Sequence, residues 1–494
     1  MVTKKQLIAN AEGLVKKKLY YLAFEQIQAE LDKSPNDVDY LVAQANICFE
    51  FSDFLTAANY IERALLLVPD NPDLLHNGAL VCAMSGLVER ALELGLKSLS
   101  VTNQSEKSWL MLANIHERKG DFVSAREAFD HVIVNDKNYE VAVNFEGKLL
   151  YAEKEYDKAI DLMVKFREWS EEPKKSVNSI DNNIVIDNMF SLVKIYNKIG
   201  EYDKAWEAAV QAHEKANQKW DQDRFNEMNW NVQDTFTKEN LEILAKSTDP
   251  FEQPVFIVGN ARSGTSLLEQ ILSMHPDVGN GGELMVTGKM QRQLPAVTDS
   301  FQKYPECIFD MRVEDANQCS KMYREAIGWF SVGKKRVTNK TIGLQGQVGF
   351  LSLVLPHSRY IMLHRHPLDN CLSCFTTNLV HTGHQYTKTI ESLGHTWVTR
   401  RKMQEYWTDV LDLPVMNLHY DKLVVDQESE TRRLIEFLDL PWNDDCLKFH
   451  KSKRVAATIS YDQVNQKMYT SSSGRWKNYE KHLGPLIEIV EEYL

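Results

Sequence analysis

The 494-residue sequence has no uncharged apolar run of about 18 residues, the length that a helix needs to cross a bilayer. Its first residues also lack the apolar core of a secretory signal peptide. These absences exclude a helical membrane anchor within the printed sequence. We therefore expect a cytoplasmic protein without membrane insertion.

Cysteine is scarce as well, with seven residues at irregular spacing. An odd number of this kind is not expected to form a disulfide framework. Cys371 and Cys374 form a lone CxxC pair, and neither an HExxH motif nor a second Cys/His pair accompanies it. We expect packed thiols and no metal site.

An excess of positive charge is also missing, because the net charge is -12. Residues 1–250 hold 29 basic and 41 acidic side chains, whereas residues 251–494 hold 28 of each. This balance excludes a uniformly basic nucleic-acid-binding protein, and no nucleic-acid partner is expected. The length indicates more than one domain, and 43% hydrophobic residues indicate globular domains with apolar cores.

The first half of the chain repeats with a period of 34 residues. Each period has an alanine and, twelve positions before it, another small residue, with a polar or glycine-containing break between them. Small residues let two helices approach closely, so the spacing predicts a stack of helical hairpins. The alanines are Ala23, Ala57, Ala91, Ala125 and Ala159, and the earlier small residues are Ala11, Ala45, Ala79, Ala113 and Gly147.

This pattern resembles the tetratricopeptide repeat family over about residues 5–215. The resemblance implies an all-α solenoid over 1–215 with a concave surface that binds a peptide or partner protein. A rigid spacer or a dimerisation element is the alternative, which leaves a homodimer open. Extra residues before a sixth unit are assigned to a polar loop over 167–183, and residues 216–250 to a helical connector.

The second half contains a strand, a glycine-bounded loop and a helix in close succession. A β-branched run at 254–258 predicts a buried strand, and an apolar run at 267–272 predicts a helix. The intervening loop suits an anion, because its backbone N–H groups and the helix N-terminus point the same way. It is not a P-loop, since Gly264 is followed by Thr265 and not by lysine, and the cation stands at Arg262.

A second strand is predicted at 359–364, and its end weakens an ATPase interpretation further. In P-loop enzymes such a strand ends in an aspartate that holds magnesium. Here Arg365 follows the strand, and Ser373 lies two turns into the next helix. An arginine and a serine so placed predict a second phosphate-binding position.

These motifs together resemble the sulfotransferases that use 3′-phosphoadenosine 5′-phosphosulfate (PAPS), with similarity to the protein-tyrosine sulfotransferases. The resemblance covers about residues 251–490, and it implies an α/β, P-loop-like domain with a mainly parallel sheet over 251–494. It assigns the 5′-phosphosulfate to the loop and the 3′-phosphate to the second position. The loop residues are Arg262, Ser263, Gly264, Thr265 and Ser266, those of the second position are Arg365 and Ser373, and the further cofactor contacts are Tyr420, Ser460, Arg475 and Lys477.

The resemblance also suggests catalytic residues. Sulfuryl transfer needs a base for the acceptor's proton and positive charge at the departing oxygen. Arg262 and Lys340 are the expected cations, and Glu283 follows Arg262 at the interval of the base in the tyrosine sulfotransferases. A capping or salt-bridged carboxylate at Glu283 and a surface lysine at Lys340 are the structural alternatives.

Histidines offer another candidate base, because ten of the fourteen follow residue 250. His364 and His366 flank Arg365, and a further group lies at His381, His384 and His395. No motif singles out one of them.

The sequence therefore predicts a sulfotransferase that moves a sulfuryl group from PAPS to an acceptor hydroxyl without a metal. A protein tyrosine, a carbohydrate and another small molecule all remain open as the acceptor. Two other classes remain as alternatives: a non-catalytic tetratricopeptide adaptor with a nucleotide-binding domain, and a P-loop-type kinase.

Overall fold

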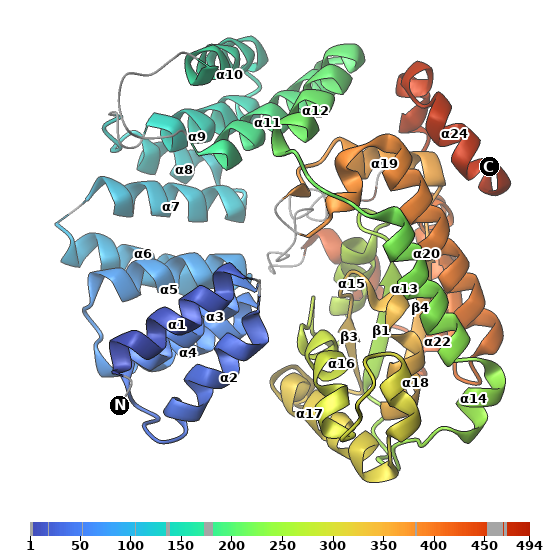
Figure 1. Ribbon diagram of the computed structural model, residues 1–494. Coiled ribbons are helices and arrows are strands. Elements are labelled where there is room, and N and C mark those ends of the chain that lie inside the picture. Colours follow the sequence, from blue (N-terminus) through green and yellow to red (C-terminus); the bar gives the residue numbers. More distant parts are fainter. Residues whose placement is uncertain are drawn as a thin grey trace. The chain divides into compact units, whose positions relative to one another are not determined.

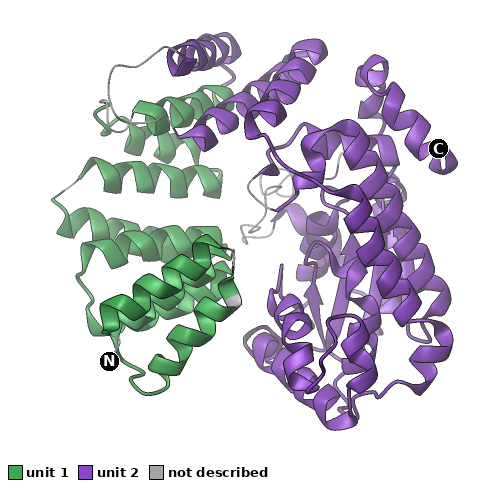
Figure 2. Cartoon of the chain, in the orientation of Figure 1, with its two compact units in different colours: residues 1–153, 453–462 green, residues 154–452, 463–494 purple. Residues whose placement is uncertain are grey.

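The computed structural model describes residues 3–17, 19–51, 53–103, 105–134, 139–171, 181–380, 383–451, 468 and 472–494. The described residues fall into two compact units, one up to Glu153 and the other from Lys154 onward (Figure 2). All described regular elements of the first unit are helices, and the second unit holds a parallel sheet (Figure 1). The predicted fold class is confirmed.

The first unit is a row of antiparallel helical hairpins whose sequence-adjacent helices pack together. The small residues of the 34-residue period lie in the core: Ala23, Ala57, Ala91 and Ala125 are fully buried. Close helix approach at these positions explains the period. The helices are α1 Lys4–Lys16, α2 Tyr20–Leu31, α3 Val38–Glu50, α4 Phe54–Leu67, α5 Pro72–Met84, α6 Val88–Val101, α7 Glu106–Lys119, α8 Phe122–Phe129 and α9 Tyr139–Ala152.

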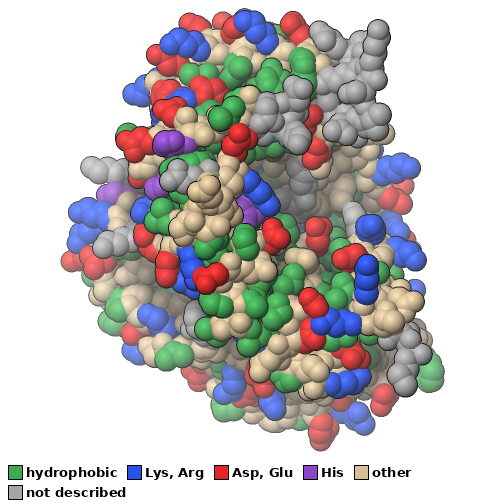
Figure 3. Space-filling view, turned by 90° about the vertical axis from the view of Figure 1, so that its left-hand side faces the viewer, with side chains coloured by type: hydrophobic (Ala, Val, Ile, Leu, Met, Phe, Trp, Pro, Cys, Tyr) green, Lys and Arg blue, Asp and Glu red, His purple; other side chains and the backbone are tan. Residues whose placement is uncertain are grey.

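Ion pairs join successive hairpins of this unit. Arg90 Nε donates to Glu62 Oε1 over 2.6 Å, and Arg126 pairs with both Glu146 and Glu153. Acidic and basic side chains are interspersed on the face drawn in Figure 3. Part of the acidity of the first half therefore lies in half-exposed ion pairs, each of which contributes about 1 kcal/mol or less.

The second unit begins with three helices of the repeat region, α10 Tyr156–Glu171, α11 Asn182–Ile199 and α12 Tyr202–Ala216. The loop predicted at 167–183 is wrong at both ends, because α10 continues to Glu171 and α11 begins at Asn182. Arg167 Nη1 donates to Gln211 Oε1 of α12, and Trp169 packs on Phe166, so this stretch has helical partners. The compact division falls between α9 and α10, and the domain boundaries at 215 and 250 stay predictions.

The core of the second unit is a five-stranded sheet in which all strand pairs of the described chain are parallel. The predicted strands at 254–258 and 359–364 are confirmed as β1 and β4. The sheet has the order β2-β3-β1-β4-β5, with β1 Pro254–Gly259, β2 Val278–Asn280, β3 Arg336–Asn339, β4 Arg359–His364 and β5 Val415–His419.

Helices cover both faces of this sheet (Figure 1). Phe256 and Val258 of β1 belong to one hydrophobic core, and Val255 and Ile257 belong to another. This alternation explains why β1 reads as a continuous apolar run. The helices of this unit after the repeat region are α13 Gln222–Thr235, α14 Lys238–Ile243, α15 Thr265–Ser273, α16 Val286–Val297, α17 Val313–Ser331, α18 Val348–Val354, α19 Pro367–Phe375, α20 Ile390–Val410, α21 Tyr420–Val425, α22 Gln427–Phe437 and α24 Gly484–Val490. Short 3-10 helices are η1 Glu306–Asp310, η2 Leu344–Gly346, η4 Gln385–Lys388, η5 Asp444–Lys451, η6 Arg475–His482 and η7 Glu491–Tyr493.

Segments before the sheet contribute to this unit's packing. Phe236, which follows α13, is fully buried and lies edge-on to Trp407 of α20. Trp206 of α12 packs on Phe375 at the end of α19, with ring centroids 4.7 Å apart. His213 of α12 also stacks on Phe375 and bonds to its carbonyl oxygen over 3.0 Å. The sheet domain is therefore held by residues well upstream of its first strand.

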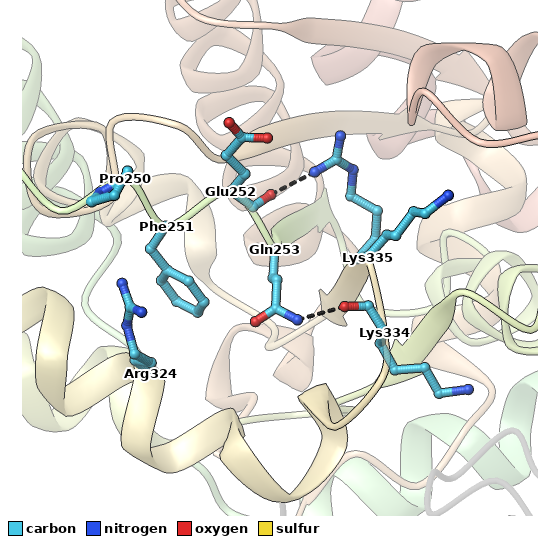
Figure 4. A pocket seen from close by; sticks show the side chains of 8 residues that line it. Pro250, Phe251, Glu252, Gln253, Arg324, Lys334 and Lys335 are labelled. Atoms are coloured by element: carbon cyan, nitrogen blue, oxygen red, sulfur yellow. Dashed lines mark hydrogen bonds between the residues drawn. The ribbon is translucent and has the colours of Figure 1, made fainter.

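An open hollow of about 370 Å³ lies where β1 and β3 begin (Figure 4). Its lining includes Glu252, Arg324 and Arg336, and most of its charges are engaged: Arg336 Nη1 donates to the Glu252 carbonyl oxygen over 2.8 Å. This hollow is at the amino ends of the strands, whereas the predicted site residues follow their carboxyl ends. Among the described helices, none is long and apolar enough to cross a membrane.

Candidate active site

The loop between β1 and α15 is closed by glycine and by its own hydroxyl group. Gly264 has φ +102°, and a Cβ there would lie 2.4 Å from the Tyr420 ring. Ser263 is buried and donates from Oγ to the Asn260 carbonyl oxygen over 2.7 Å. The helix that starts at Thr265 has no side-chain cap in its first turn. Its first backbone N–H groups, including that of Ser266, are thus arranged as in anion-binding loops.

Arg262 connects the two predicted phosphate positions. It adopts φ +63°, a conformation that non-glycine residues rarely take. Its Nε donates to Ser373 Oγ of α19 over 3.2 Å, and its carbonyl oxygen accepts from Arg365 Nη1 over 2.7 Å. The structure therefore brings the loop, the end of β4 and α19 to one place.

Arg365 lies on the ring of Tyr420, with the guanidinium carbon 4.7 Å from the ring centroid. Its Nη2 donates to the Ser472 carbonyl oxygen over 2.9 Å, and the Tyr420 hydroxyl lies 2.7 Å from Ser472 Oγ. The buried Nε of Arg365 has no hydrogen-bond partner among the described residues. A donor group of this cation is thus available to an anion.

Arg475 at the start of η6 joins the same cluster. Its Nη2 donates to Thr376 Oγ1 over 3.0 Å, and its buried Nε has no partner within the described ranges. Burial lowers the pKa of Arg475, and the charge of Arg365 acts in the same direction. Two arginines that repel each other are stabilised when an anion lies between them. Lys477, two residues on, is exposed.

Two aspartates, one in α19 and one in α21, bond to the start of η6 and the residues before it. Asp369 accepts from the Gly474 N–H over 2.6 Å and from the Trp476 N–H over 2.9 Å. Asp421 accepts from the His366 N–H over 2.9 Å and from the Ser473 hydroxyl. Sequence reasoning did not single out either aspartate, because neither spacing indicates which backbone groups it meets. The predicted contact Ser460 lies outside the described residues.

Glu283 and Lys340 form an ion pair at the carboxyl ends of β2 and β3. Lys340 Nζ donates to Glu283 Oε1 over 2.9 Å. The lysine side chain is 2% exposed and the glutamate side chain 45%. The surface-lysine alternative for Lys340 is therefore wrong, whereas Glu283 is both salt-bridged and open to solvent.

The histidines differ sharply in their surroundings. His364 accepts from Arg401 at Nδ1 and lies 2.7 Å from Asn417 Oδ1 through Nε2, so its ring is a neutral, fixed imidazole. Burial lowers its pKa to about 4. His395 is exposed, and His381 lies outside the described ranges. His364 has no lone pair free to act as a base.

His384 is a partly buried histidine whose pKa is affected by the charge of Glu283. Burial and the neighbouring Arg400 charge lower its pKa to about 4, and the Glu283 carboxylate acts in the opposite direction. Its ring stacks on Tyr386, whose hydroxyl accepts from Arg400 over 3.0 Å. This histidine belongs to the surroundings of the site, but it stays neutral near pH 7.

Both residues of the CxxC pair are buried free thiols in α19. Burial raises the pKa of Cys374 to about 11, although the charges of Arg262 and Arg400 oppose this. Cys374 donates from Sγ to the Ala261 carbonyl oxygen over 3.2 Å. The pair therefore packs α19 against the loop, as the sequence predicted.

Comparison with known proteins shows what this chain is similar to. Residues 254–444 match a family model described as the sulfotransferase family. An uncharacterized protein of Aquifex aeolicus (strain VF5) is 31% identical over 313 residues, which are 61% of this chain and 41% of that protein. Protein-tyrosine sulfotransferase A of Caenorhabditis elegans is 25% identical over 228 residues, which are 44% of this chain and 57% of that protein. The matches thus span about half the length of these relatives.

A solved structure, the sulfotransferase domain from the curacin biosynthetic pathway, also aligns with the chain. The sequence identity is 15% and the TM-score is 0.37, with 49% of this chain and 98% of that chain covered.

Proposed function

We propose that this chain, whose residues 254–444 match the sulfotransferase family model, transfers a sulfuryl group from PAPS to an acceptor hydroxyl. One observation carries the proposal: Arg262, Ser373 and Arg365 converge beside the β1 loop. The Glu283–Lys340 pair follows β2 and β3 at the same, carboxyl edge of the sheet.

The residues of this cluster fit a nucleotide with two phosphate groups. The loop and the α15 N-terminus offer backbone donors, and the missing Cβ of Gly264 lets the Tyr420 ring pack against the loop. The Nε atoms of Arg365 and Arg475, which have no hydrogen-bond partner among the residues that the structure describes, offer two more donors together with positive charge. In the proposal Arg262, Ser263, Thr265 and Ser266 hold the 5′-phosphosulfate, and Arg365 and Ser373 hold the 3′-phosphate. The Tyr420 ring packs against the guanidinium group of Arg365.

The proposed chemistry divides between cations and one carboxylate. PAPS supplies the sulfuryl group, whose bond to the phosphate oxygen breaks as a bond to the acceptor oxygen forms. Arg262 and Lys340 stabilise the negative charge that develops on the departing oxygen. Glu283 takes the proton from the acceptor hydroxyl, and its 45% exposure leaves it open to an acceptor. The nucleotide product is adenosine 3′,5′-bisphosphate.

The acceptor we favour is a tyrosine in a protein or peptide. The matched relative of Caenorhabditis elegans is a protein-tyrosine sulfotransferase, and the alignment covers 44% of this chain. The helical repeats offer a surface of the kind that binds polypeptides. A carbohydrate or another small hydroxyl compound is the competing acceptor, and a screen of peptides and glycans decides between them.

Calorimetry separates this function from its rivals. The full chain should bind adenosine 3′,5′-bisphosphate more tightly than ATP with magnesium, and Arg365→Ala should abolish that preference. Arg432→Ala removes a surface arginine of α22 that pairs with Glu428, and this variant should keep the preference. Stronger binding of ATP would favour the P-loop-type kinase. Binding of the bisphosphate without turnover of PAPS on any acceptor would favour the non-catalytic adaptor.

A further inference from the structure

Glu269 is a buried carboxylate in the helix that follows the β1 loop. It lies in the second turn of α15 and is 4% exposed. Its Oε1 accepts from the Gly282 N–H over 2.9 Å and from Thr338 Oγ1 over 3.0 Å. A carboxylate is costly to bury, so its position inside the domain calls for a reason.

The backbone that Glu269 holds is the segment before Glu283. The Gly281 N–H donates to the Thr338 carbonyl oxygen, and the Lys340 N–H donates to the Gly282 carbonyl oxygen, both over 2.9 Å. A Cβ on Gly281 would lie 2.4 Å from the Thr338 oxygen. The segment thus lies tightly against β3, and Glu269 satisfies the Gly282 N–H, which β3 does not reach.

We propose that Glu269 is the positioning residue of the Glu283–Lys340 pair. It connects α15, whose N-terminus forms the anion loop, to the two segments that carry the base and the second cation. A charge-assisted hydrogen bond from the Gly282 N–H fixes the residue immediately before Glu283. This inference rests on the proposed function for its catalytic part. Its structural part, the retention of Gly282 by Glu269, does not depend on that function.

Three variants of the full chain test the proposal. Glu269→Leu removes the acceptor and leaves the Gly282 N–H unpaired. Glu269→Gln keeps an acceptor oxygen at Oε1. Gln270→Leu is the control, because Gln270 is also buried in α15, and its Nε2 has no hydrogen-bond partner within the described part of the chain.

We expect E269L to lower kcat by about 10- to 100-fold, because a small displacement of a reacting group costs a factor of this size. Its affinity for adenosine 3′,5′-bisphosphate should stay within about twofold, and deuterium exchange in the peptide over 278–286 should accelerate. E269Q should keep kcat within about fivefold of the parent. A Glu→Gln change at a residue that exchanges a proton would lower kcat much further. Q270L should match the parent in all three measurements.

Unchanged exchange over 278–286 in E269L would overturn the proposal, and so would an unchanged kcat. A loss of turnover in E269Q as large as in E269L would also overturn it, because the charge and not the acceptor would then matter. If E269L binds no nucleotide at all, E269D gives the same test, because the shorter side chain moves its carboxylate away from both donors. If the parent transfers no sulfuryl group, the proposed function fails, and the exchange measurement alone decides the role of Glu269.

Discussion

Lys340 donates from Nζ to Oε1 of Glu283 over 2.9 Å, and the two side chains lie in different surroundings, since the lysine is 2% and the glutamate 45% exposed. A buried ammonium group requires a partner, and this partner reaches it from the solvent side. The carboxylate is therefore held in place from within the domain while it stays open to solvent. Two predictions follow from this asymmetry.

Glu283→Gln should abolish turnover while nucleotide binding persists. A general base contributes about 10²- to 10⁴-fold to the rate, so kcat with labelled PAPS should fall by at least about 100-fold. The affinity for adenosine 3′,5′-bisphosphate should change by less than about twofold, because the arginine cluster is intact. Glu252→Gln, at the hollow where β1 begins, is the matched control and should turn over normally. Normal turnover of E283Q would move the base elsewhere.

Lys340→Met should separate activity from stability. The substitution removes a buried charge, and the carboxylate left behind is half exposed and can be solvated. The free energy of unfolding should stay equal or rise, because desolvating a buried ammonium costs several kcal/mol. Turnover should fall by about 100-fold or more. Thermal unfolding and single-turnover kinetics measure the two effects. A loss of stability above about 3 kcal/mol with normal turnover would make Lys340 a structural residue.

Trp206→Ala should weaken nucleotide binding although Trp206 belongs to a repeat helix. Its ring packs on Phe375, two residues beyond Ser373 in α19, and stacks on His482 with centroids 4.9 Å apart. Loss of this support should raise the dissociation constant for adenosine 3′,5′-bisphosphate several-fold. Trp109→Ala removes a ring that stacks on His131 in the first unit, and it should leave nucleotide affinity unchanged. Equal affinities of both variants and the parent, by calorimetry, would contradict this link.

Acidification should destabilise the second unit through its buried histidines. Burial lowers the pKa of His364 to about 4 and lowers that of His213 below its ordinary value. Below about pH 6.5 these imidazoles bind protons in the unfolded chain but stay neutral in the folded one. The free energy of unfolding therefore falls as the pH decreases. His364 alone should account for about 2 kcal/mol at about pH 5.

Urea unfolding at about pH 7.5 and about pH 5 measures this dependence. His364→Gln should reduce the difference in unfolding free energy between the two pH values. His395→Gln replaces an exposed histidine of α20 and should preserve the full difference. An identical pH dependence in H364Q and the parent would show that other groups dominate acid unfolding.

Local patterns in the sequence predicted much of this protein. The 34-residue spacing predicted the buried alanines, such as Ala57 and Ala91, because helix packing repeats whenever the same small residue returns to the same face. The strand, loop and helix around Arg262 were equally predictable, because their signals lie within about twenty adjacent residues. Resemblance to a family then proposed the remaining site residues in their order along the chain.

Only the tertiary structure decided which of these residues meet. The charge at Glu269 is visible in an apolar run, but its donors lie 13 and 69 positions away. The sequence left a surface position open as an alternative for Lys340, and the fold leaves its side chain only 2% exposed. Spacing along the chain determines local structure, whereas burial and pairing of a charge depend on elements that distant segments bring alongside it. The sequence alone thus predicted the periodic array and the anion loop. Only the tertiary structure decided the pairing of Glu283 with Lys340 and its buried support at Glu269.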